Sequence, residues 1–116
     1  MESHIEVIDA RALKSYFHDG SEIALLDARE EVPFDSRHIL MASCVPLGRL
    51  ETLVDALVPR RTARVVWCDD GEGYAKVAAE KMQALGWLNV QVLGEGVTGW
   101  EGSGCRIFRN FKLITS

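Results

Sequence analysis

The chain has 116 residues, of which 47% are hydrophobic and 26% charged, and its formal net charge at pH 7 is −4. This length and composition suit one domain with a hydrophobic core. The negative charge gives no general attraction to nucleic acid or to an anionic membrane, so we expect neither as a partner. No apolar run reaches the length of a membrane span, and the first residues show no signal-peptide pattern.

The cysteines and histidines form no recognisable metal or disulfide pattern. Cys44, Cys68 and Cys105 are odd in number and widely spaced, without a Cys-x-x-Cys pair. This usage argues against a disulfide framework and a cysteine-based zinc site, and it favours a reducing compartment. The histidines show no ligand spacing either. We therefore expect a cytoplasmic protein with neither a metal nor a cofactor.

In chain order, short runs of β-branched and apolar residues alternate with stretches of helical periodicity. The predicted strands are residues 5–8, 23–27, 43–46, 64–67 and 90–93. The predicted helical segments are residues 11–18 with Asp9 as a cap, a short helix or turn within 29–36, an amphipathic stripe over 50–58, and 74–85 with an apolar face of Tyr74, Ala78, Met82 and Leu85, and Ala75 and Ala79 alongside. This alternation predicts an α/β fold with a mostly parallel five-stranded sheet covered by helices on both faces.

No boundary is visible inside residues 1–104, which we assign to a single domain. Residues 105–116 (CRIFRNFKLITS) are assigned to a C-terminal tail or linker, with a final strand as the other interpretation. His38 is interpreted as a hydrogen-bonded structural residue at the start of a turn, because nothing in the sequence brings it to a thiol.

The stretch that carries chemistry is residues 65–86, where a cysteine follows a buried strand. Cys68 is succeeded by a turn with Gly71 and Gly73, and a helix pattern begins near Tyr74. Glycines with positive φ let several N–H groups converge on one point, and a helix N-terminus carries partial positive charge. A sulfur at that point is stabilised as the reactive thiolate. The stretch predicts a reactive thiol, with a buried structural cysteine as the alternative.

Other chemistries fit this loop poorly. A Walker A loop would end in Gly-Lys-Ser/Thr, and a nucleophile elbow would hold a serine between glycines; CDDGEGY has neither. A cysteine phosphatase would place an arginine six positions after the cysteine, where this chain has Tyr74. Phosphate chemistry is therefore not expected.

Three stretches, in order and at matching spacing, resemble the rhodanese domain, a sulfurtransferase fold that carries sulfur as a cysteine persulfide. They are LLDAREEVPFDSRHILMASCVPL, VVWCDDGEGYAKVAAEKMQALGW and VQVLGEGVTGWEGSGC. The resemblance implies a doubly wound sheet, Cys68 as the sulfur-accepting nucleophile, and Asp27 and Arg29 as supporting residues. The active loop that it implies consists of Asp69, Asp70, Gly71, Glu72, Gly73 and Tyr74.

The loop departs from the thiosulfate-using members of the family, which usually carry basic residues there. Each carboxylate ~7 Å from the sulfur disfavours the thiolate by roughly 0.6–2.4 kcal/mol, whereas a helix end typically offers ~0.3–1 kcal/mol. Carboxylates also repel a dianionic donor. We expect a sulfurtransferase with a neutral or small-thiol donor, or a protein persulfide donor, and a thiol or cyanide-type acceptor. Capping of the helix by Asp70 or Glu72 is an alternative use of the acids.

A second function stays open from the sequence. The acidic loop and the apolar tail also suit a non-catalytic rhodanese-like module that regulates or binds a partner. Such a module could be one repeat of a longer multidomain protein, with a neighbouring domain as its partner.

Overall fold

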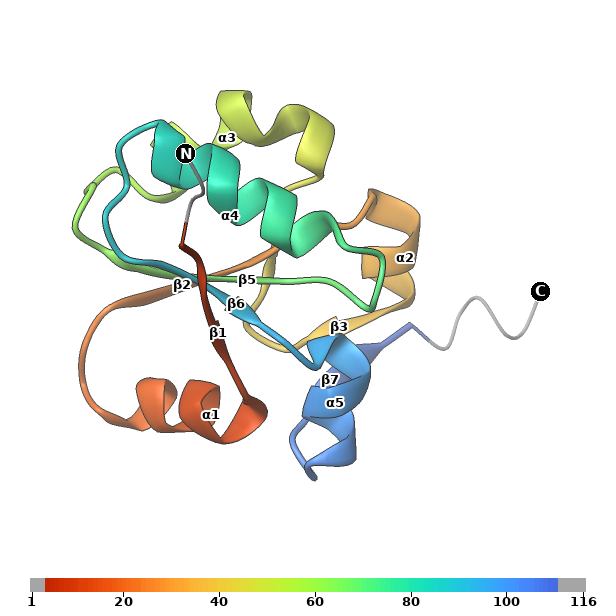
Figure 1. Ribbon diagram of the computed structural model, residues 1–116. Helices are drawn as coiled ribbons and strands as arrows, with labels where there is room; N and C mark the ends of the chain where they lie inside the picture. The colour runs from red at the N-terminus through yellow and green to blue at the C-terminus, as the bar shows by residue number, and fades with distance from the viewer. Residues whose placement is uncertain (1–3, 111–116) are drawn as a thin grey trace.

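The computed structural model describes residues 4–110 and has a five-stranded parallel sheet at its centre (Figure 1). In spatial order its strands are β1 (Glu6–Ile8), β6 (Val90–Leu93), β5 (Arg64–Cys68), β2 (Ile23–Asp27) and β4 (Ser43–Cys44). All four pairings are parallel. These are the five strands predicted from the sequence, so the predicted α/β fold is confirmed. The main difference in bounds is that β5 continues through Cys68.

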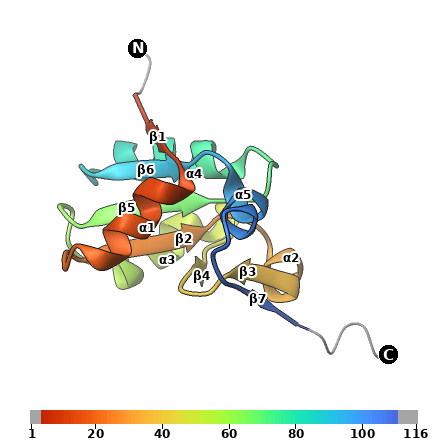
Figure 2. The same cartoon turned by 90° about the horizontal axis from the view of Figure 1, so that it is seen from below.

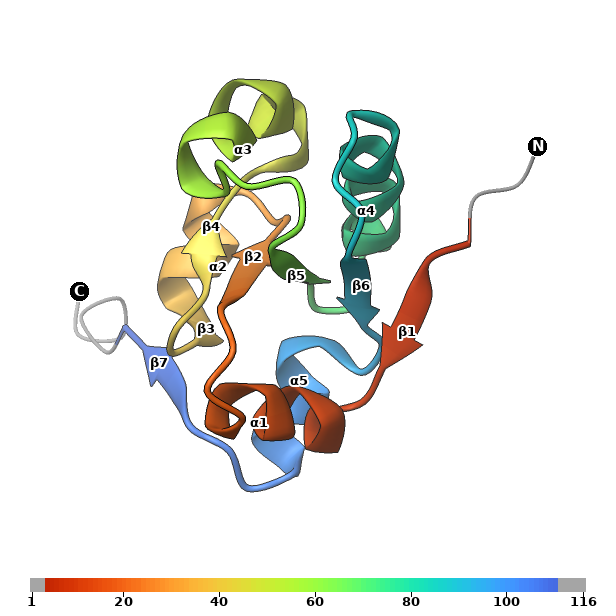
Figure 3. The same ribbon diagram turned by 90° about the vertical axis from the view of Figure 1, so that its left-hand side faces the viewer.

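Helices cover both faces of this sheet. They are α1 (Ala10–His18), α2 (Glu31–Ser36), α3 (Leu50–Leu57) after the 3-10 turn η1 (Leu47–Arg49), α4 (Tyr74–Ala84) and α5 (Gly96–Gly102). The helices α1 and α5 lie against one face (Figure 2), and α3 and α4 lie against the other (Figure 3). As predicted, the Asp9 side chain caps α1 by accepting the Ala12 N–H at 2.9 Å. Within residues 4–110, none of these helices has the length and apolar character needed to cross a membrane.

A second, two-stranded sheet was not predicted. The strand β3 (Arg37–Ile39) pairs in antiparallel register with β7 (Ile107–Arg109), beside the β4 edge of the main sheet (Figure 2). Residues 107–109 belong to the segment assigned as a tail or linker, whose residues 111–116 lie outside the described part. His38 lies within β3 rather than at the start of a turn, and its Nδ1 donates to the Phe34 carbonyl at 2.7 Å.

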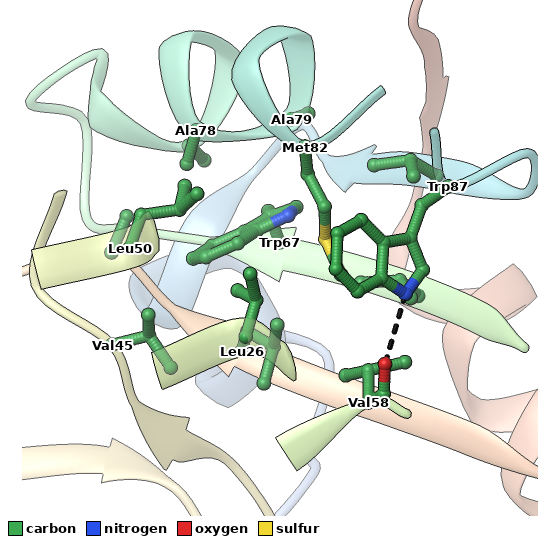
Figure 4. Close-up of a cluster of buried hydrophobic side chains, with 14 of the residues drawn as sticks. Leu26, Val45, Leu50, Val58, Trp67, Ala78, Ala79, Met82 and Trp87 are labelled. Atoms are coloured by element: carbon green, nitrogen blue, oxygen red, sulfur yellow. Dashed lines mark hydrogen bonds between the residues drawn. The ribbon is translucent and has the colours of Figure 1, made fainter. Parts of the chain in front are cut away.

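The core lies mainly between the sheet and the helices α3 and α4 (Figure 4). Trp67 and Met82 are fully buried there, and Trp87 donates its indole N–H to the Val58 carbonyl at 3.0 Å. Because side chains alternate along a strand, Trp67 faces α3 and α4 while its neighbour Cys68 belongs to the cluster under α1 and α5. This alternation sets the side of the sheet on which the thiol lies.

The predicted apolar face of α4 is partly wrong. Tyr74 and Leu85 are 40% and 43% exposed, although both fall on the predicted stripe. The rest of the predicted face is buried as expected, through its smaller residues and one methionine. These buried residues are Ala75, Ala78, Ala79 and Met82. The two larger residues lie at the first position of α4 and at its C-cap, where they stay partly exposed.

Candidate active site

Cys68 is the last residue of β5 and lies at the carboxyl end of the parallel sheet, where open α/β sheets place their ligands. Its side chain is fully buried. On β2, Asp27 stands in register with Cys68, and on β4, Cys44 stands in register with Asp27. Adjacent strands lie about 4.8 Å apart, so a carboxylate stands between two thiols in one row across the sheet.

Arg29 forms a buried ion pair with Asp27 at this row. Its Nε and Nη2 donate to the two carboxylate oxygens at 3.0 and 2.8 Å, and Nη2 also donates to the Arg37 carbonyl at 2.8 Å. Burial lowers the pKa of Arg29, but the hydrogen bond and charge of Asp27 outweigh burial and raise it overall. The structure thus brings together Asp27, Arg29 and Cys68, which the sequence analysis grouped in one site.

The environment of Cys68 favours a neutral thiol. Burial raises the pKa of Cys68 well above its ordinary value, and the charges of Asp27 and Asp69 raise it further. Arg29 acts in the opposite direction without reversing the shift. Burial and the same Asp27 raise the pKa of Cys44 to about 11. The thiolate expected from the loop pattern is therefore not favoured in this conformation.

The two glycines of the loop adopt the left-handed conformation that the sequence analysis required. Gly71 has φ +97° and Gly73 has φ +89°. Gly73 stands at the N-cap position of α4 but has no side chain to act as a cap. Within residues 4–110 the N–H groups of Glu72, Gly73 and Tyr74 have no hydrogen-bond acceptor. Three consecutive donors are thus available at the turn that follows the thiol.

Two of the three loop acids bind backbone N–H groups of the loop and helix. The two oxygens of Asp69 accept from Gly71 at 3.1 Å and Ala75 at 2.9 Å. Glu72 accepts the Asp70 N–H at 2.6 Å. Asp70 or Glu72 was the expected helix cap, whereas the structure shows that Asp69 caps α4 from upstream of the glycine turn.

The third acid, Asp70, binds two residues that the sequence analysis did not identify. One carboxylate oxygen pairs with Arg37 Nη1 at 2.6 Å, and the other accepts from the Thr98 N–H at 3.0 Å and the Thr98 hydroxyl at 2.8 Å. Burial raises the pKa of Asp70, but the hydrogen bonds from Arg37 and Thr98 outweigh burial and hold that pKa below its usual range. No local pattern marks these partners, because they lie 33 and 28 residues away in sequence.

The start of α5 packs directly on this loop. The Val97 N–H donates to the Asp69 carbonyl at 2.9 Å. Gly96 has φ +65°, and a Cβ at that position would stand 2.5 Å from the Asp69 carbonyl oxygen. Only a glycine allows this contact without a shift of the backbone. The contact holds α5 against the loop next to Cys68.

A hollow of about 410 Å³ lies on the α4 side of the loop, bounded by Gly71, Gly73, Lys76 and residues of β1 and β6. Cys68 is not part of its lining. The sulfur therefore has no contact with this hollow, and its burial closes it to a donor in this conformation. No group of three or more potential metal ligands occurs within residues 4–110.

Comparisons with known proteins agree with this architecture. The model of the rhodanese-like domain matches residues 9–103. A thiosulfate sulfurtransferase from Pseudomonas aeruginosa is 42% identical over 91% of this chain, with a TM-score of 0.86. That match covers 20% of the Pseudomonas chain, so the protein described here spans about a fifth of its length.

More distant solved structures share the fold. The rhodanese-like domain of the Alr3790 protein from Anabaena sp. has a TM-score of 0.83 and 19% identity, over 97% of this chain and 85% of that one. A rhodanese with anions from E. coli has a TM-score of 0.66 and 16% identity, over 76% of this chain and 99% of that one. No curated protein matches the chain in sequence.

Proposed function

The chain belongs to the rhodanese-like domain family, and from that premise we propose that it is a sulfurtransferase domain that carries sulfane sulfur as a persulfide on Cys68. The observation that carries the proposal is the position of Cys68, at the carboxyl end of β5 and directly before a loop with two left-handed glycines. The three N–H groups without acceptors at residues 72–74 supply donors for an anionic sulfur once the loop opens.

In the proposed first step, the Cys68 thiolate attacks the outer sulfur of a persulfide donor. A bond forms between Sγ and that sulfur, the S–S bond of the donor breaks, and the donor thiol leaves with the electron pair and the proton that Cys68 gave up. In the second step an acceptor such as cyanide or a thiol attacks the terminal sulfur. With cyanide the products are thiocyanate and the Cys68 thiol.

We infer that the donor is not a simple anion. Asp69, Asp70 and Glu72 bring three negative charges to the loop against the one positive charge of Arg37, which pairs with Asp70, and Arg29, the buried cation beside the thiol, is paired with Asp27. A dianion such as thiosulfate would approach against this charge. A zwitterionic amino-acid persulfide, another small thiol-derived compound or a protein persulfide meets a smaller barrier, so these are the proposed donor classes.

Turnover with an amino-acid persulfide as donor and cyanide as acceptor tests the proposal, with thiocyanate formation taken as the rate above that without protein, because cyanide also attacks the free persulfide. Thiocyanate formation should be lost in Cys68→Ser and retained in Cys105→Ser and Cys44→Ser, because the two remaining cysteines do not precede the loop. Thiocyanate formation that persists in Cys68→Ser, or its absence in the wild-type protein with every donor class, would contradict the proposal.

The closed state of Cys68 favours a second candidate, a non-catalytic module that binds a partner, such as a neighbouring domain of a longer protein. Its support is that the thiol is fully buried and its pKa is raised well above the ordinary value. If the chain is such a module, a rhodanese-like relative with a basic loop accepts sulfur from donors that do not load this chain. The Cys68→Ser variant then keeps full partner binding. Loading of Cys68 by any donor class rejects the module.

A further inference from the structure

We propose that Asp70 determines donor specificity, because its carboxylate fills an anion-binding site built by Arg37 and Thr98 beside the Cys68 loop. Anionic donors such as thiosulfate are thereby denied this site. The inference rests on the proposed function, since a donor site is meaningful only if Cys68 carries sulfur. It assigns the exclusion of anions to one carboxylate rather than to the summed charge of the loop.

Three donors converge on the Asp70 carboxylate. Arg37 Nη1 and the Thr98 N–H each donate to one of its oxygens, at 2.6 and 3.0 Å. Arg37 Nη2 also donates to the Thr98 hydroxyl oxygen at 2.8 Å, so the single hydroxyl proton is free to point at Asp70, 2.8 Å away. One guanidinium and two neutral donors around one carboxylate are the set that recognises a sulfonate or sulfate group equally well.

The donors are held in place without Asp70. Arg37 opens β3, and its backbone carbonyl accepts from the buried Arg29 at 2.8 Å. Thr98 lies within α5, which is fixed against the loop by the hydrogen bond from Val97 to the Asp69 carbonyl. Removal of the Asp70 carboxylate should therefore leave a preformed site in which Arg37 Nη1 has lost its partner, while Nη2 keeps the Thr98 hydroxyl and Glu101, 3.9 Å away.

The site lies close to the thiol and is open to solvent. Asp70 is two residues from Cys68, so their Cα atoms are at most about 7 Å apart. The side chains of Arg37 and Asp70 are 22% and 20% exposed, whereas Cys68 is fully buried. An anion that replaces the carboxylate is thus held beside the loop that carries the sulfur.

Asp70 is distinguished from the other two acids by what it binds. Asp69 accepts from the N–H groups of Gly71 and Ala75, and Glu72 accepts from Asp70 N–H. Both stabilise the loop backbone itself. Asp70 alone meets donors from β3 and α5, so its replacement frees an anion site without uncovering the first turn of α4.

Thiosulfate binding in a Cys68→Ser background tests the inference apart from turnover. Titration calorimetry should show at least about tenfold tighter thiosulfate binding for Asp70→Ala than for the background alone, since one charged donor and two neutral donors become free. Asp70→Asn, whose amide still fills the site, should stay near the background value. Addition of Arg37→Met to Asp70→Ala should abolish the gain.

Glu101→Gln is the matched charge control for the binding experiment, because Glu101 lies 3.9 Å from Arg37 without filling the site.

With Cys68 intact, Asp70→Ala should raise kcat/KM for thiosulfate relative to the persulfide donor by about tenfold or more. Unchanged thiosulfate binding in a folded Asp70→Ala protein, an equal gain in Glu101→Gln, or a gain that survives Arg37→Met would each overturn the inference. Failure of the proposed function has a different signature, which is no sulfur on wild-type Cys68 from any donor.

Discussion

At the scale of single residues, Cys68 is controlled by the ion pair beside it. Asp27 and Arg29 are both buried, and both act on the charge of the thiol, in opposite directions. Because Arg29 is neutralised by Asp27, burial determines the balance and the resting thiol stays protonated. The pair therefore supports the structure around the sulfur more than it activates the sulfur.

The pH dependence of Cys68 alkylation should reflect this environment. With iodoacetamide, a neutral reagent, the apparent pKa of Cys68 in the folded protein should lie above about 8.5, the value for a free thiol, because burial and two carboxylates disfavour the thiolate. Peptide-resolved mass spectrometry separates Cys68 from Cys44 and Cys105. The chain unfolded in urea provides the reference, and a folded value below that reference would contradict the account.

Breaking the buried ion pair should cost much more stability than breaking an exposed one. Arg29→Met leaves Asp27 as an unpaired buried charge and should lower the free energy of unfolding by about 3–5 kcal/mol. Arg60→Met, which breaks the exposed pair with Glu22, should cost less than about 1 kcal/mol. Urea denaturation measures both, and similar losses would show that Arg29 is not held as described.

The sequence identified Asp27 and Arg29 but not the partners of Asp70. The resemblance marks the first two because they form a short motif at the end of a buried strand. Arg37 and Thr98 meet Asp70 only through the packing of β3 and α5 on the loop, and no periodicity encodes that arrangement. For the same reason, the sequence could not show which loop acid caps α4, because Asp69 reaches the helix across a left-handed glycine turn.

At the scale of elements, the three inner strands of the main sheet, β2, β5 and β6, were predictable because each is a compact, largely apolar run. The strand β3 was not predicted, and β7 was predicted only as the alternative to a tail or linker. Both have three residues, and within residues 4–110 they pair with one another outside the main sheet, so neither shows a periodic pattern. The face of α4 was partly misjudged because alanines, rather than the larger Tyr74 and Leu85, form its contact with the sheet.

The contact between α5 and the active loop depends on Gly96. Gly96→Ala should lower the free energy of unfolding by about 1–3 kcal/mol, because the added Cβ meets the Asp69 carbonyl oxygen and φ is positive. Gly102→Ala lies in the same helix, where a Cβ has open space, and should change stability by less than about 1 kcal/mol. Equal Tm values for Gly96→Ala and the wild-type protein would contradict the described contact.

At the scale of the whole molecule, the segment after Gly104 returns to pack against β3, α2 and α5. Trp100 donates its indole N–H to the Arg106 carbonyl at 3.0 Å. The ring of His38 stacks between Phe34 and Phe108, with centroids 3.8 and 4.9 Å away. The strand β3, which carries Arg37, is therefore supported by β7, and we propose that β7 is part of the folded domain.

Shortening the chain tests this role of β7. A chain that ends after Gly104 loses β7 and leaves the Trp100 N–H without its acceptor, so its free energy of unfolding should fall by about 2 kcal/mol or more. A chain that ends after Asn110 keeps β7 and should be more stable than the chain that ends after Gly104. Equal stability of the chain that ends after Gly104 and the full chain, by urea denaturation, would show that β7 contributes nothing.

The central claim is that Cys68 carries sulfur from a donor that is not a simple anion. Mass spectrometry of peptides, taken after one exposure to an amino-acid persulfide or to thiosulfate and without reductant, tests it most directly. The account predicts one added sulfur atom on the peptide that contains Cys68 after the persulfide, and none after thiosulfate. The absence of added sulfur on Cys68 with the persulfide, or its appearance on Cys44 or Cys105 instead, would contradict the claim.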